Sequence, residues 1–221
     1  GTLTSVVPNA LKTNIANFLN RSDLTSQLDF FIDATEAEFN RRLRNKDMIK
    51  RATATADAQY ISLPNDWLEA VNVQIDSNEF RPLFQQSIES LDVYRKSTDN
   101  VASQPIYYAL VDNTIELAPT PDTSYTLQLT YYGTIDALSS SNTTNFISTG
   151  YPDAYLYGAL KHASIYLMED DRVALFTAQF EKALEEMRME QEKAEFGKGS
   201  LMQRRRTYGK AGKNIHYWSN N

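Results

Sequence analysis

The chain has 221 residues, of which 42% are hydrophobic and 23% charged, a composition typical of a folded globular protein and not of a disordered one. It contains no cysteine, which excludes disulfide bonds, thiolate metal sites and a cysteine nucleophile. Its net charge of −6 is unevenly distributed, because residues 197–221 hold six of the 22 basic residues and no acidic one. Residues 1–196 therefore carry 16 basic against 28 acidic residues, a net charge of −12. Such segregation suits contacts between copies of the chain, or docking on another acidic surface.

The sequence also lacks the signals of membrane targeting. No apolar run approaches the roughly 18 residues of a membrane-spanning helix. The stretch GTLTSVVPNALK lacks the basic start and apolar block of a secretory signal. We therefore expect a cytosolic product with no membrane partner.

Two amphipathic helices are predicted at the N-terminal end, over residues 8–21 and 22–45, with Ser22 as the N-cap of the second. The inner face of the first consists of Leu11, Ile15, Phe18 and Leu19. The apolar stripe of the second consists of Leu24, Leu28, Phe31, Ile32, Phe39 and Leu43. Its opposite face, which we expect to be solvated, consists of Asp33, Glu36, Glu38, Arg41 and Arg42.

Residues 51–133 have a different pattern, in which apolar and polar residues alternate with the period of two typical of β-strands. Asp112-Asn113 is predicted to form a hairpin turn between strands 107–111 and 114–117. In the strand that follows, Leu127, Leu129 and Tyr131 face one way, and Gln128 and Thr130 the other. A short helix is predicted at residues 86–97.

Two further helices are predicted over residues 152–168 and 171–195, antiparallel and joined by an acidic break. The polar stretch 133–150 before them is expected to wrap outward or to touch a neighbouring molecule. The order of helices, strands and helices predicts an α+β fold, mainly a helical bundle with an inserted small antiparallel β module. Residues 1–196 would form the folded domain, and residues 197–221 an extended C-terminal docking tail.

Catalytic and metal-binding patterns are weak. Only two histidines occur; His162 is expected to be partly exposed or packed, and His216 to contact a partner, so neither a metal nor a cofactor is predicted. Asp33, Glu36 and Glu38 could be proposed as an acid–base pair of a hydrolase, but their place on a polar helix face predicts ordinary surface charge. We therefore predict that the protein is not an enzyme, and keep the carboxylate hydrolase as a minor alternative.

The C-terminal tail combines cations with aromatic rings. Its candidate docking residues are Arg204, Arg205, Arg206, Tyr208, His216, Tyr217 and Trp218. Arginine and aromatic side chains dominate the energetics of protein interfaces, so the tail suits a groove on a partner. The same residue types bind single-stranded nucleic acid, which keeps open a DNA-binding or packaging accessory factor as the alternative function. Against that alternative, six charges on an acidic protein would give weak affinity at physiological salt.

A series of short motifs follows in a fixed order along residues 9–193. The first half has NRRLR at Asn40–Arg44, DM at Asp47-Met48 and LPNDWLE at Leu63–Glu69. The second half has the strand PTPDTSYTLQLTYYG, a Ser/Asn-rich loop, and YPDAYLYGAL before an acidic break. In order and spacing these motifs resemble the head-to-tail adaptor (connector) proteins of tailed bacteriophages.

The resemblance implies a virion structural protein at the head-tail interface, assembled in the cytoplasm of the bacterial host. Such adaptors form a homo-oligomeric ring, usually of twelve copies, beneath the portal protein. They extend the channel through which genomic DNA passes, bind that DNA without sequence specificity, and present the attachment surface for tail nozzle or tail tube proteins. The resemblance also implies that the C-terminal tail docks on the portal or on an adjacent copy. Candidate subunit-interface residues in the body are Arg41, Arg42 and Arg44.

Overall fold

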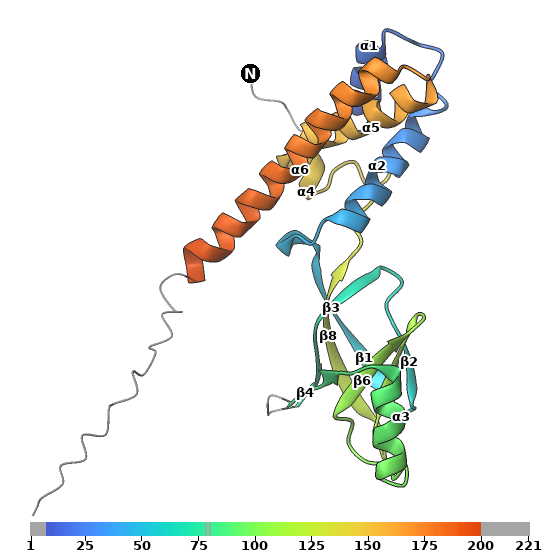
Figure 1. Cartoon of the computed structure of the whole chain (residues 1–221), viewed down its shortest axis with the longest axis vertical. Coiled ribbons are helices and arrows are strands. Elements are labelled where there is room, and N and C mark those ends of the chain that lie inside the picture. Colours follow the sequence, from blue (N-terminus) through green and yellow to red (C-terminus); the bar gives the residue numbers. More distant parts are fainter. Residues whose placement is uncertain (1–7, 78, 80, 200–221) are drawn as a thin grey trace, which may run out of the picture.

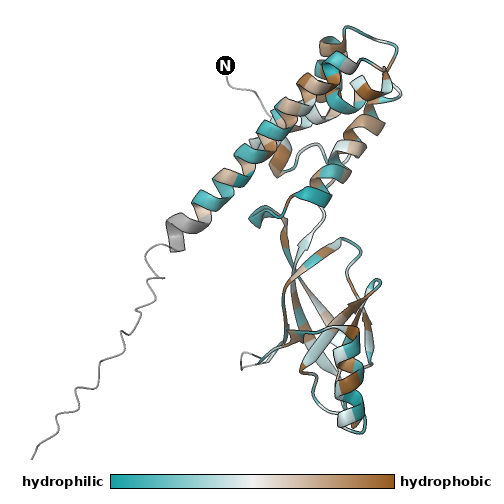
Figure 2. Ribbon diagram, viewed as in Figure 1, coloured by the Kyte–Doolittle hydropathy of each residue, from teal (hydrophilic) through white to brown (hydrophobic). Residues whose placement is uncertain are grey.

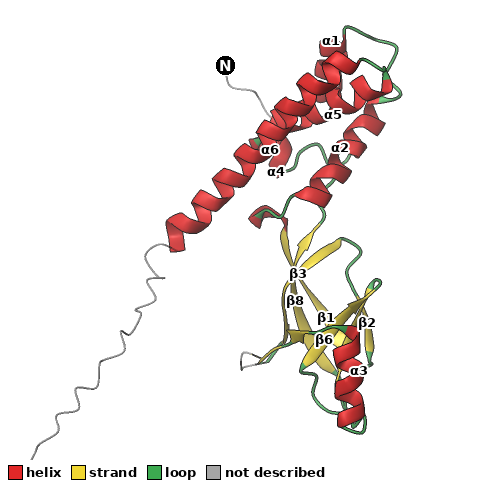
Figure 3. Ribbon diagram, viewed as in Figure 1, coloured by secondary structure: helices red, strands yellow, loops and turns green. Residues whose placement is uncertain are grey.

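The computed structural model describes residues 8–77, 79 and 81–199, so the predicted docking residues from Arg204 to Trp218 lie outside the described residues. The long helices gather at one end of the molecule, and the strands lie at the other end together with helix α3 (Ile88–Ser97) (Figures 1 and 3). The helices are α1 (Pro8–Leu19), α2 (Leu28–Arg42), a 3₁₀ turn (Lys46–Met48), α3 (Ile88–Ser97), α4 (Phe146–Gly150), α5 (Pro152–Tyr166) and α6 (Asp170–Gly199). The strands are β1 (Ile49–Ala56), β2 (Tyr60–Ser62), β3 (Trp67–Ile75), β4 (Arg81–Pro82), β5 (Phe84–Gln85), β6 (Tyr107–Val111), β7 (Thr114–Ala118) and β8 (Tyr125–Gly133). The predicted α+β class is confirmed.

The helical bundle consists of α1, α2, α4, α5 and α6 and has one apolar core. The predicted stripe of α2 is confirmed, since Leu28, Phe31 and Phe39 are buried in that core. Helix α5 contacts both α2 and α6 at Gly158, where a Cβ atom would lie 2.3 Å from Thr35 Cγ2 and 2.9 Å from Phe180 Cε2. A residue without a side chain is therefore required for the three helices to approach this closely.

Two details of the N-terminal helices differ from the prediction. Helix α2 begins at Leu28, six residues after Ser22, because residues 22–27 form turns and Leu24 is buried ahead of the helix. Phe18, predicted on the inner face of α1, is 54% exposed, whereas Ile15 and Leu19 are buried. Phe18 lies beside the buried stripe of Leu11, Ile15 and Leu19 at helical spacing. The elements packed on α1 cover that stripe but not the neighbouring side of the helix, so Phe18 stays exposed.

The β module, residues Ile49–Gly133, consists of two four-stranded sheets with the orders β1-β8-β3-β4 and β2-β7-β6-β5. Apolar side chains of both sheets form one core, separate from that of the bundle. Helix α3 packs on the outer face of the second sheet, where Leu91 meets Ala109 and Ala118. The β part is thus more than a small insertion, because it encloses a core of its own.

The local strand predictions agree well with the structure. Strands β6 and β7 pair antiparallel with Val111 opposite Thr114, which confirms the hairpin turn at Asp112-Asn113. Asp112 has a φ of 52°, in the left-handed region that such two-residue turns require. The alternation along β8 is also confirmed, because Leu127 and Leu129 are buried. The module is not wholly antiparallel, since β5 pairs parallel with β6.

Helix α6 is the longest element, with 30 residues, about 45 Å at 1.5 Å per residue. It extends past the other helices, and hydrophilic and hydrophobic residues alternate along it (Figures 1 and 2). Its buried side chains are Phe176, Phe180, Ala183, Leu184 and Met187. None of the helices in the described part of the chain combines the length and the apolarity that crossing a membrane requires.

Candidate interaction surfaces

An ionic cluster joins α2, α5 and α6. Lys161 is buried against the ring of Phe180, with Nζ 4.3 Å from the ring centroid, and donates a hydrogen bond to Glu38. Arg42 donates to Glu38 Oε1 at 3.0 Å and to both carboxylate oxygens of Glu181 at 2.6 and 2.5 Å. Burial raises the pKa of Glu38, but the hydrogen bonds from Lys161 and Arg42 outweigh it, so the pKa is lowered. The cluster holds α6 on the bundle through paired charges.

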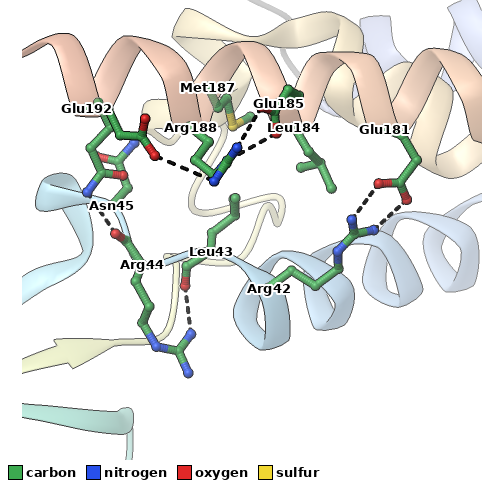
Figure 4. Close-up of a pocket in the computed structure, with 11 residues that line it drawn as sticks. Arg42, Leu43, Arg44, Asn45, Glu181, Leu184, Glu185, Met187, Arg188 and Glu192 are labelled. Carbon is green, nitrogen blue, oxygen red and sulfur yellow. Dashed lines mark hydrogen bonds and ion pairs between the residues drawn. The ribbon is translucent and has the colours of Figure 1, made fainter.

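A groove of about 470 Å³ lies below this cluster, between α6 and the segment that leaves α2 (Figure 4). The apolar side chains that line it are Leu43, Leu184 and Met187. Its charged and polar lining consists of Arg42, Arg44, Asn45, Glu181, Glu185, Arg188, Gln191 and Glu192. Arg188 bridges Glu185 at 2.7 Å and Glu192 at 3.5 Å, and Gln191 Nε2 donates to the Arg44 carbonyl at 2.8 Å. The groove thus combines three apolar side chains with paired charges around them, a composition that suits contact with another protein.

The three arginines proposed as subunit-interface residues have different surroundings. Arg42 is bound to Glu38 and Glu181, as above, and Arg44 Nε lies 2.8 Å from Glu69 while its Nη1 donates to the Leu43 carbonyl at 2.6 Å. Arg41 is exposed and takes part in no ion pair among the described residues. Arg42 and Arg44 thus contribute to the internal structure of the chain, and Arg41 is the arginine whose charge is directed to solvent.

A buried carboxylate on α2 was not expected. Glu36, predicted on the solvated face, is only 5% exposed, and its Oε1 accepts hydrogen bonds from Leu138 N at 2.8 Å and Tyr155 Oη at 2.9 Å. Burial raises the pKa of Glu36, although both hydrogen bonds oppose the shift. The signal was present in the sequence, because the apolar stripe has a gap of seven residues between Ile32 and Phe39 that Glu36 fills at helical spacing.

The arrangement of these acids argues against the minor hydrolase alternative. Glu36 is enclosed by protein donors, and the Glu38 side chain is 13% exposed and bound by two cations. Asp33 is exposed, so the predicted solvation is correct for it and wrong for Glu36. Burial lowers the pKa of His162, whose Nε2 lies 3.5 Å from Glu38 Oε2. In the described part of the chain no group of three His, Cys, Asp or Glu residues could hold a metal ion.

The polar stretch before α4 is fixed to the bundle, where the sequence led us to expect an outward loop. Asn40 Oδ1, one helical turn after Glu36, accepts a hydrogen bond from Ile135 N at 2.9 Å. Asn145 Nδ2 donates to the Asp136 carbonyl at 2.9 Å and to Tyr155 Oη at 2.6 Å. Side chains of α2 and α5 therefore position this stretch from within the chain.

The junction between the bundle and the β module is also ionic. Lys50 Nζ lies 2.9 Å from Asp66 Oδ2 and 3.2 Å from Asp136 Oδ1. Tyr131 donates to Asp66 Oδ1 at 2.9 Å. Burial lowers the pKa of Lys50, but the two carboxylates outweigh it and the pKa is raised. Lys50 thus connects β1 to the chain entering β3 and to the chain leaving β8.

A group of aromatic side chains joins β5, α3 and β6, and Figure 1 shows α3 at the end of the molecule away from the bundle. Phe84 is 56% exposed, and its ring centroid lies 6.5 Å from that of Tyr107, which in turn lies 5.1 Å from that of Tyr94. Gln86, Ser90 and the two tyrosines line a shallow cavity of about 190 Å³ beside it. Phe84 is the exposed member of this group, and Tyr94 and Tyr107 are half-buried beneath the cavity.

Two modules with separate cores, ion pairs at their junction and exposed apolar side chains suit a protein that acts through its surfaces. A comparison with protein families agrees, since the model of the SU10 adaptor protein matches residues 9–206. The chain belongs to the SU10 adaptor family, a family of phage head-to-tail adaptors. It is thus a phage structural protein and a component of the virion, as the sequence motifs led us to expect. A search of curated proteins finds no match.

Proposed function

We propose that the protein forms a ring beneath the portal protein of a tailed phage, in twelve copies, and that this ring extends the DNA channel. The ring also provides the surface to which tail nozzle or tail tube proteins attach. The observation that carries the proposal is the family match over residues 9–206, because this family joins the phage head to the tail. The two-module shape supports it, since the bundle and the β module offer different surfaces at opposite ends of the molecule (Figure 1).

The experiment that tests the ring is a reconstruction of the purified particle that locates and counts this chain. We expect many copies around the tail axis, directly below the portal. One or two copies per particle, or a position away from the vertex, would contradict the proposal. As a functional test, a phage lacking the gene is expected to give DNA-filled heads without attached tails.

The docking tail predicted over residues 197–221 is proposed as the docking arm from residue 200 on, because residues 197–199 belong to helix α6. Its Arg204, Arg206, Tyr208 and Trp218 combine charge with aromatic area, and residues 197–221 are basic while the rest of the chain is acidic. Removal of residues 200–221, outside the helices described above, is expected to abolish portal binding and leave the fold unchanged. Binding to purified portal by both forms, measured at equal protein concentration, checks this.

The alternative, a DNA-binding or packaging accessory factor, is favoured by the same segregation of charge. It predicts that double- and single-stranded DNA bind with a logarithmic salt slope of up to about −5, since six cations can neutralise at most six phosphates. If deletion of residues 200–221 abolishes DNA affinity while portal affinity is absent in both forms, the alternative replaces the docking arm.

A further inference from the structure

Two helices of the bundle present outward faces that nothing in the described chain covers. The outward α2 face consists of Phe30, Ala34, Ala37 and Arg41, which recur every three or four residues. The outward α6 face consists of Ala174, Leu175, Ala178, Lys182 and Glu186. Both faces lie opposite the buried stripes of their helices, so they point away from the shared core. Figure 1 shows the two helices on different sides of the bundle.

The composition of both faces is typical of helix packing. Phe30 is 66% exposed and Leu175 is 55% exposed, values unusual for side chains of this size at the centre of a helix face. Two alanines lie beside each of these side chains on its helix face. Because alanine is small, the axis of another helix can approach to about 8 Å, the lower limit of the usual 8–10 Å between packed helices. Each face ends in charge, with Arg41 on one, and Lys182 and Glu186 on the other.

The direction of the two helices fits side-by-side contact between copies. The start of α2 lies near the turn that precedes α6, because the Phe31 ring centroid is 5.7 Å from that of Tyr166. The end of α2 lies beside the middle of α6, where Arg42 meets Glu181. Both helices therefore run from the same end of the bundle in the same sense. Rotation about an axis along the bundle preserves that sense, so α2 of one copy can lie parallel to α6 of the next.

We propose that the outward α2 face of one copy packs on the outward α6 face of the adjacent copy. A ring needs two different surfaces on each subunit, and these faces supply one each. In a parallel arrangement Phe30 lies against Leu175, and Arg41, eleven residues later, meets Glu186, eleven residues after Leu175. The occupant is thus a second copy of this chain. The inference rests on the ring proposed above, and it names the contact that builds it.

The absence of native cysteine makes cross-linking a clean test. A chain carrying both Ala34→Cys and Ala178→Cys, which lie one residue apart in this register, is expected to give a ladder of covalent multimers when it is incorporated into phage particles and oxidised. Particles built from a mixture of the two single variants are expected to stop at dimers, and each single variant alone to stay monomeric. The matched control is Ala34→Cys with Ala102→Cys, since Ala102 is exposed in the β module, and no ladder is expected.

The outcomes separate the inference from the proposed function. A double-cysteine chain that is incorporated at normal copy number but gives no ladder overturns the contact and leaves the ring standing. Dimers of Ala34→Cys alone, or its cross-linking to the portal, also overturn it. A wild-type chain found outside the vertex overturns the ring itself.

A second variant tests the apolar part of the contact. Phe30→Asp is expected to reduce incorporation into particles by about tenfold or more relative to wild type, as for a central interface anchor. Phe18→Asp is the matched control, because Phe18 is 54% exposed on α1, outside both faces, and normal incorporation is expected. Unchanged helical circular dichroism shows that each variant folds. If Phe30→Asp is incorporated into particles as well as Phe18→Asp, the proposed contact is overturned.

Discussion

The two halves of the molecule close their cores in different ways. The β module is formed by one continuous stretch, Ile49–Gly133, in which β3 with β4 and β6 with β7 pair across short connections, whereas β1 and β8 pair across the whole stretch. The bundle is formed by two stretches on either side of it, and its central contacts, such as Glu36 with Tyr155, join residues more than 100 positions apart. Both cores therefore depend on contacts that close long loops, but the bundle needs two stretches of the chain to meet across the β module, and the β module needs only its own stretch. A disturbance of α5 should affect the bundle first.

The largest effect is expected from Gly158→Ala in the bundle. The new Cβ would lie 2.3 Å from Thr35 Cγ2, so α2 and α5 must separate, and we expect the free energy of unfolding to fall by about 3 kcal/mol or more. Thermal unfolding followed by far-ultraviolet circular dichroism measures this. Gly150→Ala is the control, since no atom lies within 4 Å of its Cβ and a change below about 0.5 kcal/mol is expected. Equal losses in both would contradict the close approach at Gly158.

The matching disturbance of the β module is Arg95→Met. Arg95 Nη1 lies 2.5 Å from Glu116 Oε1, and both side chains are nearly buried, so the variant leaves a buried carboxylate without its cation. We expect a loss of about 3 kcal/mol. Fluorescence of Trp67, which stacks on Tyr131 at 4.8 Å, reports this module in a Trp218→Phe background. The exposed neighbour Lys96→Met should leave the transition unchanged; if it does not, the buried pair is not the cause.

Breaking the ionic cluster of the bundle is expected to cost somewhat less. In Glu38→Gln the Lys161 ammonium loses its counter-charge. Because the Lys161 side chain is 10% exposed and that of Glu38 is 13% exposed, water still reaches the pair in part, and we expect the free energy of unfolding to fall by about 2 kcal/mol. Chemical denaturation compares it with Asp33→Asn, an exposed acid of the same helix whose replacement should be neutral. A loss shared by both variants would assign the effect to helix charge and not to the cluster.

The same residue predicts a dependence on pH. Because the pKa of Glu38 is lower in the folded state than its usual value near 4.5, its contribution to stability is present above that value. It is lost as the pH falls through the lowered folded-state pKa. The difference in stability between wild type and Glu38→Gln should therefore be constant near neutral pH and shrink below about pH 4. A difference that grows on acidification would mean that the pKa is raised instead.

The smallest effect is expected at the junction. Lys50 is 32% exposed and Asp136 is 73% exposed, so Lys50→Ala should cost about 1 kcal/mol or less, and less again at high salt. This variant tests whether the two modules unfold together. Weakening the junction should separate the unfolding transition of the β module, followed by Trp67 fluorescence, from that of the bundle, followed by the loss of helical circular dichroism. Coincident transitions in this variant would show that the modules unfold as one unit by other contacts.

The sequence by itself determined the local structure. The stripe of α2, the alternation along β8 and the turn at Asp112-Asn113 follow from spacing and turn chemistry, which act over a few residues. The order and spacing of the motifs also indicate the adaptor family, because both are properties of the linear chain. Arg41 is the one proposed interface arginine whose charge the structure leaves open to solvent.

Tertiary structure decided which charges are buried and which apolar groups are not. Periodicity places Glu36 and Lys161 near an apolar stripe, but their burial depends on partners, Tyr155 and Glu38, supplied by another helix. Phe18 and Phe30 are exposed for the converse reason, since no distant element of the chain covers them. A buried charge is stable only when a donor or counter-charge reaches it, and the sequence does not state which distant segment will do so.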